Sequence, residues 1–262
     1  MISFTIDLED YTGQYEPDGR YVIMTRRILD LCDSINCKAT FFIVGRVAEG
    51  APRLIQEIAS KGHEVAYHSH NHVSLTEETP ERFKRESDID KDRFEQLIGS
   101  RIIGFRAPRF SLTPESQWAI DVLGDLGFRY SSSLMPTHLS RFGFPGASRG
   151  VSQWPNGMVE VPLPVADLGP MRIPYLGGIY LYALPSFLTR HWLKRANHGE
   201  MLWTYTHPYD FDLEEQFRPM VGEPFWVSAV LWGARSFAEK KVCKLLSQGT
   251  APPLGLRVIK LI

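Results

Sequence analysis

The residues best suited to chemistry in this chain are histidines that follow a short apolar run. In the segment GHEVAYHSHNH, His68 and His72 lie four residues apart, directly after the run Glu64–Tyr67. Two imidazoles at this spacing reach one divalent cation if the turn after the run is helical. A solvated histidine-rich loop shows the same letters, so the spacing alone leaves both interpretations open. His70 stands at the odd position between them, and we expect it to face away.

A carboxylate to complete such a metal site is expected from Asp7-Leu8-Glu9-Asp10, which follows the apolar residues 2–6. Hydrolytic metals usually take two histidines and one carboxylate, which leaves positions for water and substrate. Three acids in four residues repel one another unless they share a cation or a proton, although an exposed acidic turn needs neither. In an extended strand Asp7 and Glu9 share one face and Asp10 takes the other. Glu9 is therefore the first choice of ligand, Asp10 is the alternative, and Asp7 is left to act as a base.

The elements that must position these groups alternate between short β-branched or aromatic runs and longer segments of helical period, which is typical of parallel α/β architecture. We expect a single domain with about seven strands, and the segment 213–262 packed on it as a helical extension. Residues 142–178, rich in glycine and proline, are expected to form an irregular lip. The predicted strands are 2–6, 39–44, 64–67, 102–105, 129–134, 159–163 and 201–206, and the main predicted helices are 22–35, 52–61, 80–97, 114–126 and 187–195.

Polar residues follow four of these strands at the end where parallel α/β folds build their sites. Asp7 and Glu9 follow the first strand, and the histidine pair follows the third. Arg106 follows the fourth and His207 follows the seventh. We therefore expect all four segments to meet in one crevice.

Composition excludes several classes of protein. The 262 residues carry 29 Lys and Arg against 30 Asp and Glu, so no basic excess is present to bind nucleic acid. We expect no transmembrane segment and no secretion signal, and three cysteines without a CxxC pair favour a reducing compartment. A cytoplasmic protein is expected, either free or peripheral at the inner membrane. An aromatic stretch over 225–237 has helical spacing, which favours a helix packed on the domain over a membrane-touching one.

Five ordered motifs carry a resemblance to a known family. TIDLED, ATFFIVG, GHEVAYHSHNH, FRAPRFSLT and TYTHPYDFD resemble the successive motifs of the NodB-homology polysaccharide deacetylases, carbohydrate esterase family four. The opening Asp-x-Glu-Asp is similar to that of the bacterial branch found with surface-polysaccharide genes. The resemblance spans roughly residues 2–212. It implies a distorted seven-stranded (β/α) barrel of the NodB-homology type and hydrolysis of an N-acetyl group by a metal-bound water.

The resemblance also implies roles for individual residues. The family's metal motif maps onto His68, Ser69 and His72, its Arg-x-Pro motif onto Arg106 and Pro108, and its late histidine onto His207. Asp7 would be the base, His207 the acid, and Arg106 would orient Asp7 and keep it ionised. The ligands suit zinc, although cobalt, nickel or iron would fit similar donors. The candidates for substrate contact are Tyr11, Pro108, Arg109 and Tyr180.

Two departures from the family pattern bear on the site. Relatives carry an aspartate in the fifth-strand motif, where this chain reads Tyr130-Ser131-Ser132-Ser133-Leu134, so Asp210 or Asp212 is a candidate to orient His207 instead. Close relatives also tend to carry an arginine near the position of Tyr182. These changes indicate a different acceptor sugar or acyl group within the same reaction class.

The sequence thus predicts a de-N-acylase acting on an amino sugar, whether free, nucleotide-linked, lipid-linked or polymeric, in surface-polysaccharide synthesis such as that of O-antigen or exopolysaccharide. A non-sugar amidase or cyclic-imide hydrolase on the same barrel is one alternative, and a catalytically silent sugar-binding homologue is the other. The sequence leaves the oligomeric state open.

Overall fold

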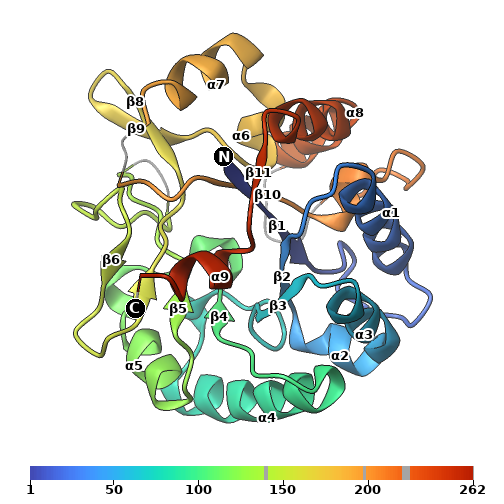
Figure 1. The fold of residues 1–262 in the computed structure, drawn as a ribbon, viewed down its shortest axis with the longest axis vertical. Helices are drawn as coiled ribbons and strands as arrows, with labels where there is room; N and C mark the ends of the chain where they lie inside the picture. The colour runs from blue at the N-terminus through green and yellow to red at the C-terminus, as the bar shows by residue number, and fades with distance from the viewer. Residues whose placement is uncertain (139–140, 197–198, 220–224, 262) are drawn as a thin grey trace.

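A computed structural model describes residues 1–138, 141–196, 199–219 and 225–261 (Figure 1). The strands of the main sheet are β1 (Ile2–Leu8), β2 (Thr40–Ile43), β3 (Glu64–Tyr67), β4 (Gly104–Phe105), β5 (Tyr130–Ser131), β6 (Ser152–Gln153), β7 (Val159–Glu160), β10 (Trp203–Thr206) and β11 (Thr250–Ala251). A separate hairpin joins β8 (Val165–Leu168) and β9 (Met171–Pro174). The α-helices are α1 (Arg20–Ser34), α2 (Gly45–Gly50), α3 (Pro52–Ser60), α4 (Pro80–Ile98), α5 (Trp118–Asp125), α6 (Gly178–Ala183), α7 (Ser186–Leu193), α8 (Phe225–Leu246) and α9 (Leu254–Val258).

Seven parallel strands form a curled sheet in the order β10-β1-β2-β3-β4-β5-β7. β6 pairs antiparallel with β7, and β11 pairs parallel with β1. Within the described residues no strand pairing joins β7 to β10, so the barrel has an open seam. The predicted fold class, a distorted seven-stranded (β/α) barrel, is confirmed.

Alternation along the strands separates two apolar clusters. On β2, Phe41 and Ile43 pack outward against the helices, whereas Phe42 packs inside the barrel with Trp203 of β10. Successive residues of a strand point to opposite faces, so β1 sends Phe4, Ile6 and Leu8 outward. The alternate residues of β1, which are Ser3, Thr5 and Asp7, are buried on the other face. The first strand therefore supplies polar groups to the barrel interior.

Most of the helices lie outside the sheet (Figure 1), whereas α9 packs Leu254 and Val258 on the cluster inside the barrel. Local signals set the ends of several helices. α3 begins with Pro52 in its first turn, where the missing amide hydrogen costs nothing. At the start of α4 the Thr79 hydroxyl accepts a hydrogen bond from the Arg82 amide, and the helix ends at Gly99, whose φ is +67°. Glycine adopts this left-handed conformation without the steric cost that a side chain brings.

Three expectations for the elements need correction. The lip at residues 142–178 contains more than the predicted strand that became β7, because β6 and the β8–β9 hairpin also form there, with the hairpin turn at Gly169, whose φ is +61°. The helix expected at 114–126 is a 3-10 turn at Pro114–Ser116 followed by α5. The turn after β3 is not helical. The glycine, proline and polar residues in these segments do not by themselves determine such local conformations.

The long helix α8 packs on α6 and on the 3-10 turn Pro208–Phe211. Lys241 fixes this contact, because its ammonium donates hydrogen bonds to the carbonyls of Leu181, Tyr182 and Leu184 at the end of α6. A cation here satisfies carbonyls that the helix leaves unpaired. The prediction of one domain with a helical extension agrees with this packing and stays a prediction. No described helix combines the length and the apolar character needed to cross a membrane.

Candidate active site

A hollow of about 790 Å³ opens at the carboxyl ends of the parallel strands. Residues from the loops after β1, β3 and β10 line it, as the sequence predicted for a shared crevice. Among its lining residues are Asp7, Glu9, His68, His72 and His207. The structure thus brings together the four segments singled out from the sequence, with Arg106 buried beneath Asp7.

Glu9, His68 and His72 form a group that fits a metal ion. Among the described residues, this is the one group of histidines, cysteines and acids with suitable spacing. One ligand atom from each residue lies within 4.8 Å of the others. The His72 Nε2 atom is 2.6 Å from Glu9 Oε2, and the two imidazole ring centres are 5.1 Å apart. Two histidines and one carboxylate are the usual donors of a hydrolytic zinc site.

The two histidines meet by a different route from the expected one. Residues 68–72 form no helical turn; instead Ser69 and His72 adopt left-handed conformations with φ of +61° and +56°. Such values are uncommon for residues with a side chain and occur often at functional sites. The strain is the local cost of turning the His72 ring back toward His68.

His68 is oriented for ligation by its second nitrogen. The His68 Nδ1 atom lies 2.7 Å from the Arg106 carbonyl oxygen, so Nδ1 carries the hydrogen and donates to it. Nε2 then keeps its lone pair, as in the usual arrangement of metal-binding histidines. Burial lowers the pKa of His68 to about 4, so the imidazole is neutral at pH 7. Its orientation and its charge state both suit a ligand.

Glu9 is ionised in this setting. Burial by itself raises the pKa of the Glu9 carboxyl, but the charge and hydrogen bond of His72, together with the charge of His207, outweigh it and hold that pKa well below its usual range. A buried carboxylate among imidazoles has the charge that a divalent cation requires. The donor set therefore fits a metal in chemistry as well as in position.

Asp10, the alternative ligand, stabilises the turn that follows it in the chain. Its Oδ2 atom accepts hydrogen bonds from the backbone amides of Gln14 and Tyr15 at 2.9 and 3.3 Å, and from the Thr12 hydroxyl. His70 also faces elsewhere, with Nδ1 2.9 Å from Asp90 Oδ2. Neither residue belongs to the group that fits the metal, so the geometry favours Glu9 over Asp10.

Arg106 holds Asp7 from inside the barrel. Its guanidinium is fully buried and ion-paired with the Asp7 carboxylate. It also donates hydrogen bonds to the Thr5 hydroxyl at 2.9 Å and to the carbonyl and hydroxyl oxygens of Ser132, both at 3.2 Å. The rings of Phe42 and Trp203 lie 3.9 and 4.2 Å from the guanidinium carbon. The pairing agrees with the sequence prediction that Arg106 orients Asp7.

His207 faces Glu9 on one side and Asp210 on the other. Its Nδ1 atom is 3.0 Å from Asp210 Oδ2, and its Nε2 atom is 3.8 Å from Glu9 Oε1. Burial disfavours the charged imidazole, but Asp210, Glu9 and Asp7 overcome this effect and raise the pKa of His207 to about 9. His207 is therefore protonated at neutral pH, which is the form a general acid needs.

Of Asp210 and Asp212, the two acids that the sequence offered as partners of His207, Asp210 is the one in contact with it. Besides contacting His207, its carboxylate accepts a hydrogen bond of 2.8 Å from the Tyr182 hydroxyl. Asp212 is instead paired with Arg20 on α1. At the fifth-strand motif, Glu160 on neighbouring β7 accepts hydrogen bonds from the Ser133 and Leu134 amides, both at 2.9 Å.

Tyr209 is a residue that the sequence reasoning missed. Its hydroxyl donates a 3.0 Å hydrogen bond to Glu9 Oε1, and its ring stacks on His207 with centres 4.6 Å apart. Arg235 of α8 lies over the outer side of Tyr209, 5.2 Å from the ring centre. The one available signal was its place two residues after His207 in TYTHPYDFD.

The candidates for substrate contact divide into two groups. Tyr11, Arg109 and Tyr180 line the hollow, whereas Pro108 is buried and is not part of the lining. Arg109 follows Pro108 in a left-handed conformation with φ of +56°. The structure adds Val227 and Leu231 of α8 to the lining, two residues that the sequence analysis did not connect with the site.

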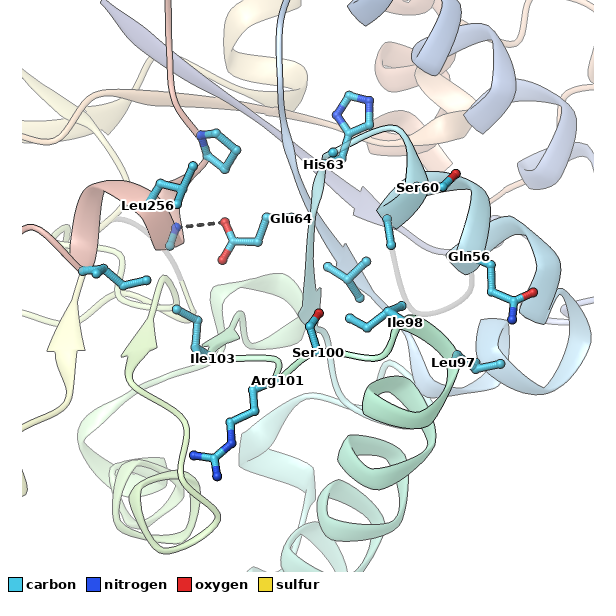
Figure 2. Close-up of a pocket in the computed structure, with 16 residues that line it drawn as sticks. Gln56, Ser60, His63, Glu64, Leu97, Ile98, Ser100, Arg101, Ile103 and Leu256 are labelled. Carbon is cyan, nitrogen blue, oxygen red and sulfur yellow. Dashed lines mark hydrogen bonds between the residues drawn. The ribbon is translucent and has the colours of Figure 1, made fainter.

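A second hollow, of about 530 Å³, lies at the opposite, amino-terminal ends of the strands (Figure 2). Its wall combines apolar residues such as Val65, Ile103 and Leu256 with polar ones such as Gln56 and Arg101. Glu64 points into this region, but its carboxylate already accepts hydrogen bonds from the Gly255 amide and from the hydroxyls of Thr40 and Tyr130. Among the residues that the structure describes, no group that fits a metal ion lies at this end of the barrel.

Comparison with known proteins bears on this geometry. Residues 17–131 match the family described as polysaccharide deacetylase, and residues 132–250 match a domain of unknown function, DUF3473. The chain therefore contains a polysaccharide deacetylase domain over residues 17–131. His68, His72 and Arg106 lie inside these matched residues. Asp7, Glu9 and His207 lie outside them.

The curated relatives of this chain include proteins named as peptidoglycan and chitooligosaccharide deacetylases. Peptidoglycan-N-acetylglucosamine deacetylase of Bacillus cereus is 33% identical over 97 residues, which cover 37% of this chain and 33% of that protein. Chitooligosaccharide deacetylase of Sinorhizobium fredii is 30% identical over 110 residues, which cover 40% and 47%. The first three curated relatives are covered over only 32% to 57% of their lengths.

Solved structures agree with the barrel architecture. A crystal structure from Mycobacterium smegmatis, assigned to the polysaccharide deacetylases, aligns with a TM-score of 0.56 at 20% identity. The alignment covers 96% of this chain and 91% of that one. At this identity the likeness shows the polysaccharide deacetylase fold.

Proposed function

We propose that this chain is a metal-dependent hydrolase that removes an N-acyl group, most simply acetyl, from an amino sugar in bacterial surface-polysaccharide synthesis. The observation that carries the proposal is the meeting of Glu9, His68 and His72 with Asp7 and His207 in one hollow. The match of residues 17–131 to the polysaccharide deacetylase family supports the reaction class. The opening motif Asp-x-Glu-Asp and the resemblance it carries support the surface-polysaccharide branch.

Glu9, His68 and His72 would hold the metal, zinc in our proposal. When bound, such an ion polarises the amide carbonyl and lowers the pKa of a coordinated water. The chain supplies the fixed parts, because Arg106 orients His68 through its carbonyl and Tyr209 orients Glu9 through its hydroxyl. Outer partners of this kind set the direction of the ligand atoms.

Proton transfer would be divided between Asp7 and His207, which both line the hollow. Asp7 would accept a proton from the attacking water, and Arg106 keeps that carboxylate in place. His207, protonated at neutral pH, would donate a proton to the leaving amine nitrogen. Without that proton the amine would depart as an unstable anion, so the acid is as necessary as the base.

The three cysteines, all free thiols, support a reducing compartment, and we propose a cytoplasmic site of action. We also propose that the chain acts as a single barrel domain, with segment 213–262 as an extension that contributes Val227 and Leu231 to the hollow. The amino sugar would contact Tyr11, Arg109 and Tyr180 along the lining.

The test is release of acetate or formate from a panel of N-acylated amino sugars and nucleotide sugars, measured with zinc-loaded and chelator-treated protein. Glu9→Gln should abolish both release and high-affinity zinc binding. Asp10→Asn is the matched control, because Asp10 is adjacent in sequence and engaged in its own turn. Release from simple amides or cyclic imides instead of sugars would favour the amidase alternative. Zinc binding without any release would favour a sugar-binding homologue.

A further inference from the structure

Helix α8 presents a continuous stripe on its outer side. We define the α8 stripe as Trp226, Val230, Gly233, Phe237, Lys240 and Lys244, which are spaced four, three, four, three and four residues apart and are all exposed. This spacing places them on one side of the helix. The opposite side, with Ala234, Ala238, Val242 and Leu245, is buried against the barrel.

The first half of the α8 stripe is unusually apolar for a surface. Trp226 is 68% exposed, Val230 45% and Phe237 55%. Phe225 beside them is also exposed and packs edge to face with Phe217, with ring centres 5.7 Å apart. Contiguous exposed aromatic residues mark an interaction surface rather than scattered single side chains.

The second half of the α8 stripe is cationic. Lys240 and Lys244 follow Phe237 on the same side, and no carboxylate of the described residues forms an ion pair with either. The one acid of α8, Glu239, is paired with Arg27 at 2.6 Å. A partner for the whole stripe must therefore offer an apolar region beside negative charge.

The α8 stripe also adjoins the candidate active site. Val227 and Leu231, one turn apart on the same helix, line the hollow that holds Glu9 and the histidines. Trp226 and Val230 are their immediate neighbours in sequence. Whatever covers the α8 stripe therefore lies next to the mouth of that hollow.

We propose that the α8 stripe docks the protein on an anionic lipid surface, with Trp226 and Phe237 entering the boundary between headgroups and acyl chains. Tryptophan and phenylalanine are the side chains that interfacial helices bury there, and lysines bind the acidic headgroups. A phospholipid surface offers apolar chains and negative charge side by side, which matches both halves of the stripe. Docking brings the mouth of the hollow to the membrane, where a membrane-held substrate would be presented.

The experiment measures binding of the full chain to vesicles of phosphatidylglycerol and phosphatidylcholine by flotation. Binding should require phosphatidylglycerol. It should also weaken at 0.5 M salt, because the Debye screening length is then on the order of a few ångströms. Trp226→Ser with Phe237→Ser should abolish flotation. Lys240→Gln with Lys244→Gln should weaken it about thirtyfold, since each lysine near an acidic surface contributes roughly fivefold.

Matched controls come from α4, on the opposite side of the barrel from α8 (Figure 1). Ile89 is 53% exposed there, and Lys84 is an exposed lysine paired with Asp125. Ile89→Ser and Lys84→Gln should leave flotation unchanged. Brominated lipid should quench the emission of Trp226, and Trp226→Phe should remove that quenching while keeping most of the binding.

Three results would overturn the proposal: no flotation of the wild type, equal flotation with both lipids, or flotation that the stripe variants do not change. A dimer in lipid-free solution that Trp226→Ser with Phe237→Ser dissociates, without vesicle binding, would assign the stripe to a second copy of the chain. Thermal unfolding should be unchanged in these variants, because the replaced side chains are exposed. Deacylation of a soluble sugar should also be unchanged, so failure of docking and failure of the proposed activity are separable.

Discussion

The Tyr209 hydroxyl donates a 3.0 Å hydrogen bond to Glu9 Oε1, while Glu9 Oε2 lies 2.6 Å from His72. One oxygen of the carboxylate is thus held by the chain and the other faces the candidate metal position. The same tyrosine ring stacks on His207, so one side chain touches both the proposed ligand set and the proposed acid.

Tyr209→Phe should weaken zinc binding by about 10- to 100-fold, because the Glu9 carboxylate loses the hydrogen bond that fixes its orientation toward the metal. The measurement is competition with a chromogenic chelator. Tyr11→Phe is the control, since the Tyr11 hydroxyl donates to the Arg218 carbonyl and its ring also packs edge to face against Tyr209. Equal zinc affinity in both variants would remove Tyr209 from this role.

Asp7→Asn should lower kcat by about 10²- to 10⁴-fold while zinc still binds, because a general base is lost and the ligands remain. It should also lower the free energy of unfolding by about 3 kcal/mol, since Arg106 is left buried without its counter-charge. Urea unfolding measures the second effect. In the double variant with Arg106→Met the stability loss should shrink, and additive losses would contradict the pairing.

Asp210→Asn should lower the pKa of His207, because Asp210 is the strongest of the groups that raise it to about 9. The imidazolium is then lost at lower pH, so the alkaline limb of the pH profile of kcat should move downward. NMR titration of the metal-free protein reports the His207 pKa directly. Asp212→Asn, which disturbs only the pair with Arg20, should leave that pKa in place.

His63 should make the barrel sensitive to mild acid. Burial lowers the pKa of His63 to about 4, against about 6.5 in an unfolded chain. The unfolded chain binds the proton more readily, so stability is fully present above pH 6.5 and is lost as pH falls through 4. In metal-free protein, His63→Asn should lose about 2 kcal/mol less over this interval, as urea unfolding at each pH would show. Parallel curves would contradict this assignment.

The sequence predicted the barrel because each parallel strand is a short apolar run between turn residues. Buried strands such as β1 and β2 carry that signal in their own letters, and the polar residues after them follow from strand topology. The conformation of the 68–72 turn lay beyond this reasoning, because left-handed values at Ser69 and His72 are imposed by the surrounding packing. Which of Asp210 and Asp212 contacts His207 also depends on the path of the chain after β10, which the sequence does not reveal.

Helix α8 shows a different limit of sequence reasoning. Aromatic residues at helical spacing predicted a face packed on the domain, and α8 does pack on the barrel, but through alanines, Val242 and Leu245. Trp226 and Phe237 lie on the outer side instead. The spacing of hydrophobic residues identifies a helix. Which of its faces is buried depends on the surface it packs against, and a short stretch of sequence does not contain that information.

The guanidinium of Arg106, enclosed by Phe42 and Trp203, has a consequence for how this chain can diverge. A mutation that discards the Asp7 carboxylate removes a proposed proton acceptor and strands a cation at the centre of the barrel in the same event. Descendants that abandon catalysis through this residue must first tolerate a less stable barrel or replace the arginine as well. Selection for foldability alone would therefore preserve the Asp7–Arg106 pair long after selection for turnover had ceased.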